Sequence, residues 1–273
     1  MTHIIPTTML FVPGDRPDRL AKAAATGADA IVMDLEDAVI AENKAACRHT
    51  LASLTAFDVP LFIRCNGTDS EWFADDLLAI RDSVATGVIV PKSETPDQID
   101  AVQAVLGSDA FIIALVETAR GIDQLAALLA HPGVAVCAFG HLDFALDLGT
   151  SPDWEPLLYA RHQLVLQSRL AHKPKPLDGV SVEIDDLDAV SHAAMRARAM
   201  GFGGKLLIHP NHVEPAMAAF VPDEDTYQWA LAALEKSEAG AAAKMDGQML
   251  DLPVIKKAKQ IIRDYENHSK ANS

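Results

Sequence analysis

The most constraining feature of this chain is a series of eight short apolar runs, each followed by a polar or charged residue. The runs are continuous rather than alternating, which is typical of strands that are buried on both faces of a parallel sheet. They cover residues 9–12, 30–33, 61–63, 88–90, 112–116, 134–139, 178–182 and 206–208, of which 178–182 is the weakest. If eight such strands close into a barrel, their carboxyl ends and the polar residues that follow them meet at one mouth.

Amphipathic segments lie between the runs, the longest over residues 154–171 with leucines spaced for one helical stripe. A strand followed by a helix, eight times over, predicts an α/β fold and specifically a (β/α)8 TIM barrel. The length of 273 residues fits one such barrel of about 250 residues plus a short extension. A doubly wound open sheet is the alternative, but the count of eight and the lack of a Gly-rich phosphate turn after the first run favour the barrel.

The pattern changes after residue 221. Residues 226–244 predict an Ala-rich helix, 245–253 a turn-rich break, and 254–265 a final helix. We therefore expect a TIM barrel catalytic domain over residues 1–221 and a C-terminal helical extension over 222–273. The extension could act as a lid, as an oligomer arm or as packing beneath the barrel.

The overall charge limits the partners of this chain. A net charge of −15 argues against nucleic acid and against anionic membrane surfaces, because both need a basic footprint. No apolar run approaches the roughly 20 residues of a membrane span, and residues 1–6 lack the features of a signal peptide. The three cysteines lie in apolar settings and are interpreted as reduced core thiols, so we expect a cytoplasmic protein.

Two carboxylates follow neighbouring runs. Glu117 comes directly after the run at 112–116, and Asp143 follows the run at 134–139, so adjacent strands would place them side by side. Two carboxylates without a Cys or His partner suit Mg²⁺, which keeps several waters, better than zinc. A Mg²⁺ with open positions can chelate a 2-oxo or 2-hydroxy acid. The alternative is that both side chains cap the helices that follow.

An acidic cluster and an arginine follow the second and third runs. Glu36 and Asp37 could accept hydrogen bonds from the water shell of a metal, whereas Asp34 is more simply a helix cap. Arg64 comes directly after residues 61–63, where an unpaired charge would be costly. It therefore needs an anion, which could be a protein carboxylate or a substrate carboxylate held by two hydrogen bonds.

For other basic residues at strand ends, the sequence gives weaker support for a functional role. Arg16 lies in a strand-to-helix turn suited to a phosphate or to Asp18 and Asp34. Lys92 could be a Schiff-base lysine, but a metal with an arginine can stabilise an enolate without covalent help.

Several motifs together resemble the HpcH/HpaI aldolase and citrate lyase beta-subunit family, which includes malyl-CoA and citramalyl-CoA lyases. The motifs occur in order at residues 10–17, 34–39, 64–66, 90–92, 117–118, 140–143 and 204–210. The resemblance implies a TIM barrel with Mg²⁺ on Glu117 and Asp143 and a substrate carboxylate on Arg64. It also implies that the turn of Gly140, His141 and Leu142 contacts the bound oxo acid through its backbone.

Residues 248–253 resemble the C-terminal lid of the CoA-ester lyases. The resemblance implies that Asp251 reaches the active site of a neighbouring subunit and that the protein is a homo-oligomer, either a trimer or a dimer of trimers. Some shorter family members lack this lid, so its presence favours a stand-alone lyase over a complex-bound subunit.

The expected function is Mg²⁺-dependent cleavage of a 3-hydroxyacyl-CoA ester, such as citramalyl-CoA or malyl-CoA, into acetyl-CoA and a 2-oxo acid. Arg64 would hold charge on the substrate, Asp251 would protonate the enolate carbon, and Arg16 would lie where CoA phosphates run. The alternatives are a Mg²⁺-dependent aldolase, a malyl-CoA thioesterase, or a citrate lyase beta-like subunit that needs an acyl-carrier partner.

Overall fold

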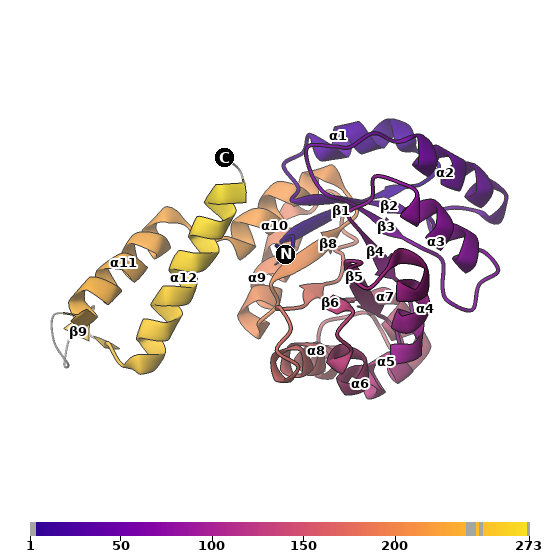
Figure 1. Ribbon diagram of the computed structural model, residues 1–273. Coiled ribbons are helices and arrows are strands. Elements are labelled where there is room, and N and C mark those ends of the chain that lie inside the picture. The colour runs from indigo at the N-terminus through magenta and orange to yellow at the C-terminus, as the bar shows by residue number, and fades with distance from the viewer. Residues whose placement is uncertain (1–3, 239–243, 246–247, 272–273) are drawn as a thin grey trace. The chain divides into compact units, whose positions relative to one another are not determined.

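The structure is a computed structural model that describes residues 4–238, 244–245 and 248–271 (Figure 1). The chain divides into two compact units, Met1–Met217 and Ala218–Ser273. Within the described part, no helix is both long enough and apolar enough to cross a membrane.

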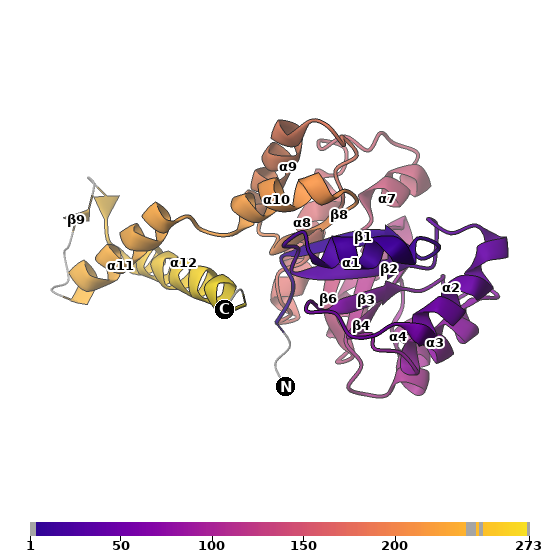
Figure 2. The same ribbon diagram turned by 90° about the horizontal axis from the view of Figure 1, so that it is seen from above.

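The first unit is a closed barrel of eight parallel strands in sequential order (Figures 1 and 2). The strands are β1 (Thr8–Pro13), β2 (Ala30–Asp34), β3 (Leu61–Arg64), β4 (Gly87–Val90), β5 (Ile112–Val116), β6 (Val134–Phe139), β7 (Leu177–Asp178) and β8 (Gly204–Leu207). This arrangement confirms the predicted TIM barrel and rules out the open sheet, because β8 pairs with β1.

Helices surround the ring of strands (Figure 1). They are η1 (Pro17–Arg19), α1 (Leu20–Ala24), α2 (Ala41–Ser53), α3 (Phe73–Arg81), α4 (Pro96–Leu106), α5 (Ala119–Asp123), α6 (Leu125–Ala130), α7 (His141–Leu148), α8 (Leu158–Leu170), α9 (Leu187–Met200), η2 (Pro210–His212) and α10 (Val213–Phe220). Helix α8 begins four residues later than the sequence pattern suggested. Pro156 accounts for this, because proline disfavours helical backbone at the residue before it.

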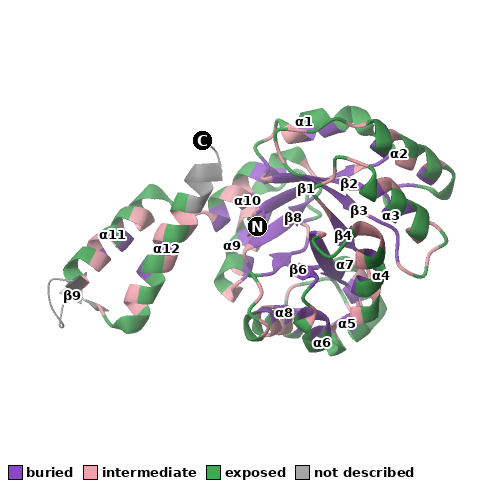
Figure 3. Ribbon diagram, viewed as in Figure 1, coloured by how far each residue is buried: buried purple, intermediate pink, exposed green. Residues whose placement is uncertain are grey.

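The barrel interior is a packed core rather than a channel (Figure 3). All eight strands contribute buried side chains to one cluster, which comprises Met9, Ala30, Val32, Phe62, Ile89, Phe111, Ile113, Leu115, Val136, Ala138, Leu177 and Leu206. Apolar interiors of this kind close the barrel below its mouth, so polar chemistry is confined to the carboxyl ends of the strands.

Strand β7 differs from the prediction. The apolar run at 178–182 suggested a strand there, but β7 covers only Leu177–Asp178. Gly179 packs so closely on His141 that a Cβ at this position would collide with the imidazole ring. Its carbonyl oxygen accepts a hydrogen bond from Lys205 Nζ at 2.5 Å instead of continuing the sheet.

A buried ion cluster holds this short strand in the barrel wall. Asp178 Oδ1 lies 3.0 Å from Arg161 Nε, and its Oδ2 lies 3.4 Å from Lys205 Nζ. The three side chains, which we call the wall cluster, are all nearly inaccessible to solvent. Lys205 therefore has a structural role, as the ion-pair partner of a buried carboxylate.

The second unit is a helical hairpin. It contains α11 (Glu224–Glu238), the antiparallel pair β9 (Lys244–Met245) and β10 (Gln248–Met249), and α12 (Leu252–Ala271). The two helices pack through the small residues Ala230, Ala233 and Ala258 and through Ile261, which lets their backbones approach closely. The two helices predicted for the C-terminal extension are thus present with different bounds, and the antiparallel strand pair between them begins at Lys244, the last residue of the predicted first helix.

Candidate active site

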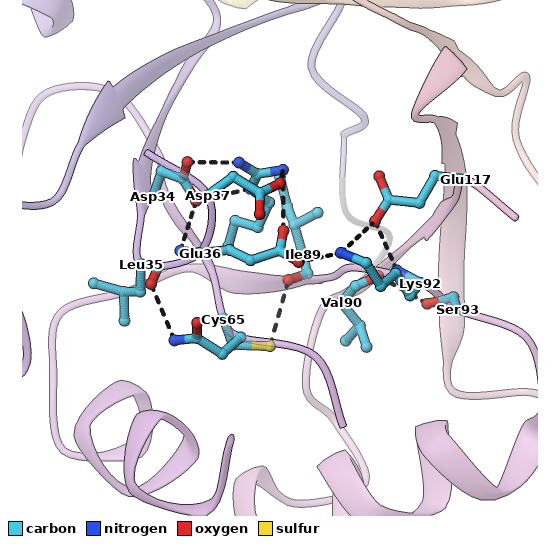
Figure 4. A network of polar contacts seen from close by, with 12 residues as sticks. Asp34, Leu35, Glu36, Asp37, Cys65, Ile89, Val90, Lys92, Ser93 and Glu117 are labelled. Carbon is cyan, nitrogen blue, oxygen red and sulfur yellow. Dashed lines mark hydrogen bonds and ion pairs between the residues drawn. The ribbon is translucent and has the colours of Figure 1, made fainter. Parts of the chain in front are cut away.

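The carboxyl ends of neighbouring strands bring together the side chains that the sequence placed at the mouth. Asp34 ends β2 and Arg64 ends β3, and the two residues are register partners in the sheet. Lys92 follows β4 and Glu117 follows β5. Together with Glu36, these residues form one network of polar contacts, which we call the mouth cluster (Figure 4).

Arg64 is surrounded by protein carboxylates. Its Nε and Nη2 donate hydrogen bonds to the two oxygens of Asp34 at 2.7 and 2.6 Å. Its Nη1 lies 3.1 Å from Glu36 Oε2 and 3.7 Å from Asp37 Oδ2. Burial lowers the pKa of Arg64, but the bonds and charges of Asp34 and Glu36 more than offset this and raise it. The protein itself thus supplies the anion that Arg64 requires, which is the first of the two predicted alternatives.

Asp34 has a structural role, but the predicted helix cap is wrong, because α2 begins only at Ala41 and its N-cap is Ile40. Its two carboxylate oxygens accept hydrogen bonds from the backbone N–H groups of Glu36 at 3.0 Å and Ala38 at 3.2 Å. These bonds fix the turn that follows β2, and the same carboxylate anchors Arg64. Asp34 therefore holds the acidic turn against the end of β3.

Lys92 connects the two buried glutamates. Its Nζ donates to Glu36 Oε1 at 2.6 Å, and its backbone N–H donates to Glu117 Oε1 at 2.8 Å. Lys92 adopts a left-handed backbone with φ of 48°, a conformation that costs energy for a residue with a side chain and that recurs at functional sites.

The protonation of Lys92 bears on the Schiff-base alternative. Burial lowers the pKa of Lys92, but the bond and charge of Glu36 outweigh it and raise the pKa. A raised pKa keeps the amine charged and non-nucleophilic, which weighs against the Schiff-base role considered for this lysine.

Glu117 lies at the centre of the mouth cluster and is 1% exposed. Burial raises its pKa to about 8, with a further contribution from the charge of Glu36, whereas Arg64 and Lys92 oppose the shift. A Cβ on Gly140 would collide with Glu117 Oε2, so only glycine leaves room for this carboxylate. The site therefore holds a carboxylate whose ionised form lacks sufficient compensation from the protein alone.

Asp143 lies in the first turn of α7 and is close enough to Glu117 for its charge to raise the pKa of that carboxyl. The helix-cap alternative is wrong for both residues. The N-cap of α5 is Thr118, whose side chain accepts a bond from the N–H of Gly121, and the N-cap of α7 is Gly140, without a side-chain cap. Neither carboxylate is used to begin a helix.

This donor set suits a hard cation that keeps much of its water. In the described part of the chain, no group of three or more His, Cys, Asp and Glu side chains could hold a metal ion. Two carboxylates with water or substrate oxygens completing the shell match the preference of Mg²⁺, and they do not match a closed structural zinc site. Glu117 and Asp143 are the residues that would hold such an ion.

The turn from Gly140 to Asp143 presents the N-terminus of α7 to the mouth. The first N–H groups of a helix have no partner within the helix and favour an anion. His141 is buried, and burial lowers its pKa to about 4, so its imidazole is neutral at neutral pH. Leu142 is 38% exposed beside it. These features are compatible with the predicted backbone contacts to a bound oxo acid.

A basic cavity lies beside β1 and β8. It has a volume of about 470 Å³ and is lined by Leu10, Phe11, Val12, Pro13, Arg16, Asp18, Arg19, Lys22, Ala23, Ile208, His209 and Pro210. Arg16 Nε lies 3.1 Å from Asp18 Oδ1, and both side chains are exposed. Of the two protein partners predicted for Arg16, the structure thus shows Asp18.

Asp37 and Asp251, two of the residues predicted to be catalytic, lie outside the mouth cluster. Asp37 contributes only a distant, largely exposed carboxylate, 3.7 Å from Arg64. Asp251 belongs to the second compact unit, where it is exposed and caps α12 by accepting a bond from the N–H of Val254 at 3.1 Å. The catalytic role of Asp251 stays a prediction.

Lys44 and Asp76 are buried polar residues near the mouth that the sequence reasoning missed. Both have less than a tenth of their surface exposed. The signal was present in α2, where Lys44 shares the buried face with Cys47 and Leu51 at helical spacing. A charged residue on such a face needs a buried partner.

A closed barrel with a cluster of carboxylates and cations at the carboxyl ends of its strands defines a TIM-barrel enzyme. Residues 7–210 match the model of the HpcH/HpaI aldolase/citrate lyase family, and the chain belongs to this family. The resemblance drawn from the motifs is thereby confirmed.

Known proteins resemble the chain along almost its whole length. A citrate lyase subunit beta-like protein of Deinococcus radiodurans is 36% identical, with 93% of this chain and 95% of the relative covered. A (3S)-malyl-CoA thioesterase of Cereibacter sphaeroides is 33% identical, with 95% and 94% covered. The crystal structure of CitE from Mycobacterium tuberculosis in complex with magnesium, acetoacetate and coenzyme A has a TM-score of 0.85 at 30% identity, with 95% and 98% covered.

Proposed function

We propose that this chain is a Mg²⁺-dependent carbon–carbon lyase that cleaves a 3-hydroxyacyl-CoA ester, such as malyl-CoA or citramalyl-CoA, into acetyl-CoA and a 2-oxo acid. The observation that carries the proposal is Glu117, a buried carboxylate with a pKa raised to about 8, beside Asp143 and a strand-end arginine. The complex of the Mycobacterium relative with magnesium, acetoacetate and coenzyme A supports the same combination of ligands.

The reaction moves two electron pairs: the carbon–carbon bonding pair passes to the α-carbon, and the O–H pair becomes part of the new C=O bond as the hydroxyl proton leaves to solvent water. The bond between the α-carbon of the thioester and the carbon bearing the hydroxyl breaks, the hydroxyl loses its proton as it becomes an oxo group, and the α-carbon takes up a proton. Bound Mg²⁺ supplies Lewis-acid polarisation of the hydroxyl and carboxylate oxygens. Glu117 and Asp143 would hold the ion, and Glu36 and Asp37 would accept hydrogen bonds from the water bound to it.

The remaining residues act on the organic fragments. Arg64, kept charged by Asp34 and Glu36, stabilises negative charge that develops on the substrate. The N-terminal turn of α7, from Gly140 to Asp143, offers backbone N–H groups to the oxo acid. The cavity lined by Arg16, Arg19, Lys22 and His209 provides positive charge for the phosphates of CoA.

Asp251 is proposed to donate the proton to the α-carbon, and it would do so in the active site of a neighbouring subunit. This role requires a homo-oligomer, which we propose to be a trimer or a hexamer. We propose a cytoplasmic location, supported by the three free and buried cysteines.

Exchange of Asp251 tests the shared site. Asp251→Asn keeps a cap for α12 but removes the acid, so we expect turnover to fall by about 10²-fold or more while Mg²⁺ affinity is unchanged. Mixed oligomers of Asp251→Asn and Glu117→Gln subunits should regain activity if one subunit supplies the acid and another the metal site. Full activity of Asp251→Asn alone would contradict the assigned role.

A second candidate function is hydrolysis of malyl-CoA, because a (3S)-malyl-CoA thioesterase shares 33% identity with this chain over almost its whole length. The products separate the two reactions. Purified protein with Mg²⁺ is incubated with malyl-, methylmalyl- and citramalyl-CoA, and acetyl-CoA, oxo acid and free CoA thiol are measured.

We expect acetyl-CoA and an oxo acid in equal amounts. Release of free thiol with malate or citramalate would show a thioesterase instead. Turnover that appears only after addition of an acyl-carrier protein would show a citrate lyase beta-like subunit, whereas cleavage of a free oxo acid would show an aldolase.

A further inference from the structure

A buried lysine lies directly behind the acidic turn of the mouth cluster. Lys44, on α2, is 5% exposed, a depth at which an ammonium group is costly unless all its donors are used. Its Nζ donates to the carbonyl oxygens of Leu35 at 2.7 Å and Glu36 at 2.9 Å and to Asn66 Oδ1 at 2.6 Å. The three donors of the ammonium are thus matched by three acceptors.

The acceptors of Lys44 are themselves fixed. Asn66 Nδ2 donates to the Leu35 carbonyl oxygen at 3.0 Å and to Asp76 Oδ2 at 2.6 Å. The other oxygen of Asp76 accepts a hydrogen bond from Arg48 Nη1 at 3.0 Å. A buried network in which every member has partners is rigid, and this one joins the exits of β2 and β3 to α2 and α3.

The two carbonyls that Lys44 binds belong to the peptide groups on either side of the Cα atom of Glu36. Holding both peptides leaves the backbone at Glu36 little freedom, so the direction of its side chain is set from behind. That side chain extends towards Lys92, as Figure 4 shows, and its Oε1 meets Lys92 Nζ at 2.6 Å. Lys44 thus acts on the carboxylate through the backbone and not by touching it.

We propose that Lys44 is a positioning residue that holds the Glu36 carboxylate in place for the water shell of the metal and for Arg64 and Lys92. The inference rests on the role proposed for Glu36 above. Loss of a group that orients a metal's ligands typically changes metal affinity or activity by about 10- to 100-fold, and Lys44 lies further from the ion, so the lower end of that range is expected.

Lys44→Met tests the proposal because methionine fills most of the space and removes the ammonium. We expect kcat to fall by about tenfold or more with a smaller change in KM, and Mg²⁺ affinity measured by calorimetry to fall by about tenfold.

Lys173→Met is the matched control. Lys173 Nζ also donates to two backbone carbonyls, those of His131 at 3.0 Å and Val134 at 2.6 Å, but these lie at the start of β6, at the opposite end of the barrel. The control should lose stability and keep both kcat and Mg²⁺ affinity. Equal effects of the two variants on Mg²⁺ affinity would overturn the proposal.

A double-mutant cycle with Glu36→Gln shows whether Lys44 acts through Glu36. We expect Lys44→Met to reduce kcat in the parent protein but to add little in the Glu36→Gln background. If Glu36→Gln has no effect on Mg²⁺ affinity or kcat, the role proposed for Glu36 fails. If Glu36→Gln is impaired and Lys44→Met adds its full effect to it, the positioning role fails.

Asp76→Asn provides a milder variant should Lys44→Met not fold. It keeps the shape of the side chain but weakens the support of Asn66, the side-chain acceptor of Lys44. We expect a smaller fall in kcat and Mg²⁺ affinity in the same direction, and unchanged values for both would overturn the proposal.

Discussion

The mouth cluster and the wall cluster are both built from ion pairs at the carboxyl end of the barrel, yet their excess charges have opposite signs. The mouth cluster sets the carboxylates of Asp34, Glu36 and Glu117 against the two cations Arg64 and Lys92. The wall cluster sets the single carboxylate of Asp178 against two cations, Arg161 and Lys205. One cluster has more carboxylates than cations, and the other has the reverse.

The solvent exposure of each cluster determines what its excess charge can do. The Lys92 side chain is 44% exposed and Arg64 13%, so the mouth can be reached by an ion or a substrate. The wall cluster is sealed, and its Arg161 also packs against the rings of Phe139 and Trp154 at 5.2 and 4.0 Å. When Glu117 ionises, the mouth cluster gains a negative excess beside solvent that a divalent cation can neutralise, whereas the sealed wall cluster serves structure.

The largest effect on turnover is expected when the carboxylate of Glu117 is removed from the mouth cluster. Glu117→Gln should abolish Mg²⁺-dependent turnover, because Lewis-acid stabilisation worth several kcal/mol is lost with the ion. Calorimetry with Mg²⁺ should show no binding, while the fold without metal stays intact.

Glu94→Gln is the control for this prediction. Glu94 Oε1 accepts a hydrogen bond from the hydroxyl of Thr118, the residue next to Glu117, and the variant should still bind Mg²⁺. Mg²⁺-dependent activity in Glu117→Gln would contradict the assignment of Glu117.

The wall cluster should respond in stability instead. Asp178→Ala leaves two buried cations without their carboxylate, and loss of one partner from a buried pair costs about 3–5 kcal/mol. Urea unfolding measures this free energy. Asp82→Ala, which breaks the exposed pair with Arg81, should cost far less, because solvent screens that pair. A similar small loss in both variants would show that the wall cluster is not structural.

A further effect is a pH dependence to which Glu117 contributes. Because burial raises the pKa of Glu117 from its ordinary value of 4.5 to about 8, the folded protein binds a proton that the unfolded chain releases between these values. The stability of the metal-free protein should therefore fall as pH rises from about 5 to 8.

Melting temperatures with and without Mg²⁺ measure this dependence. Since Mg²⁺ needs the ionised carboxylate, the stabilisation it provides should be larger at pH 8 than at pH 5. Glu117→Gln should lose this dependence on pH. A stabilisation by Mg²⁺ that is equal at both pH values would contradict the raised pKa.

Much of the fold and part of the site were predictable from the sequence. Continuous apolar runs give parallel strands, and closure of the barrel then forces the residues after the runs to one end. Arg64 and Glu117 were predicted in this way because each directly ends or follows a strand, whereas Asp34 was assigned as a helix cap although it ends β2. Their mutual contacts follow from the register of adjacent strands.

Other features depend on contacts that no local pattern encodes. The left-handed backbone of Lys92 is stabilised by bonds to Glu36 and Glu117, which are distant in the sequence. Lys44 gave only a weak signal on one helix face, and its partners come from two other segments. β7 was misplaced because its end is determined by side-chain packing on Gly179 rather than by hydrophobicity.

The short length of β7 determines where the barrel is expected to open locally. β7 has one register pair with β6 and two with β8. It is therefore the most weakly hydrogen-bonded strand in the ring. Local opening and amide hydrogen exchange should therefore begin there. In a ring of eight strands, β7 lies opposite β3, whose end carries Arg64. Opening at β7 would therefore disturb the contact of Gly179 with His141 before it reaches the pairing of Asp34 with Arg64 on β2 and β3.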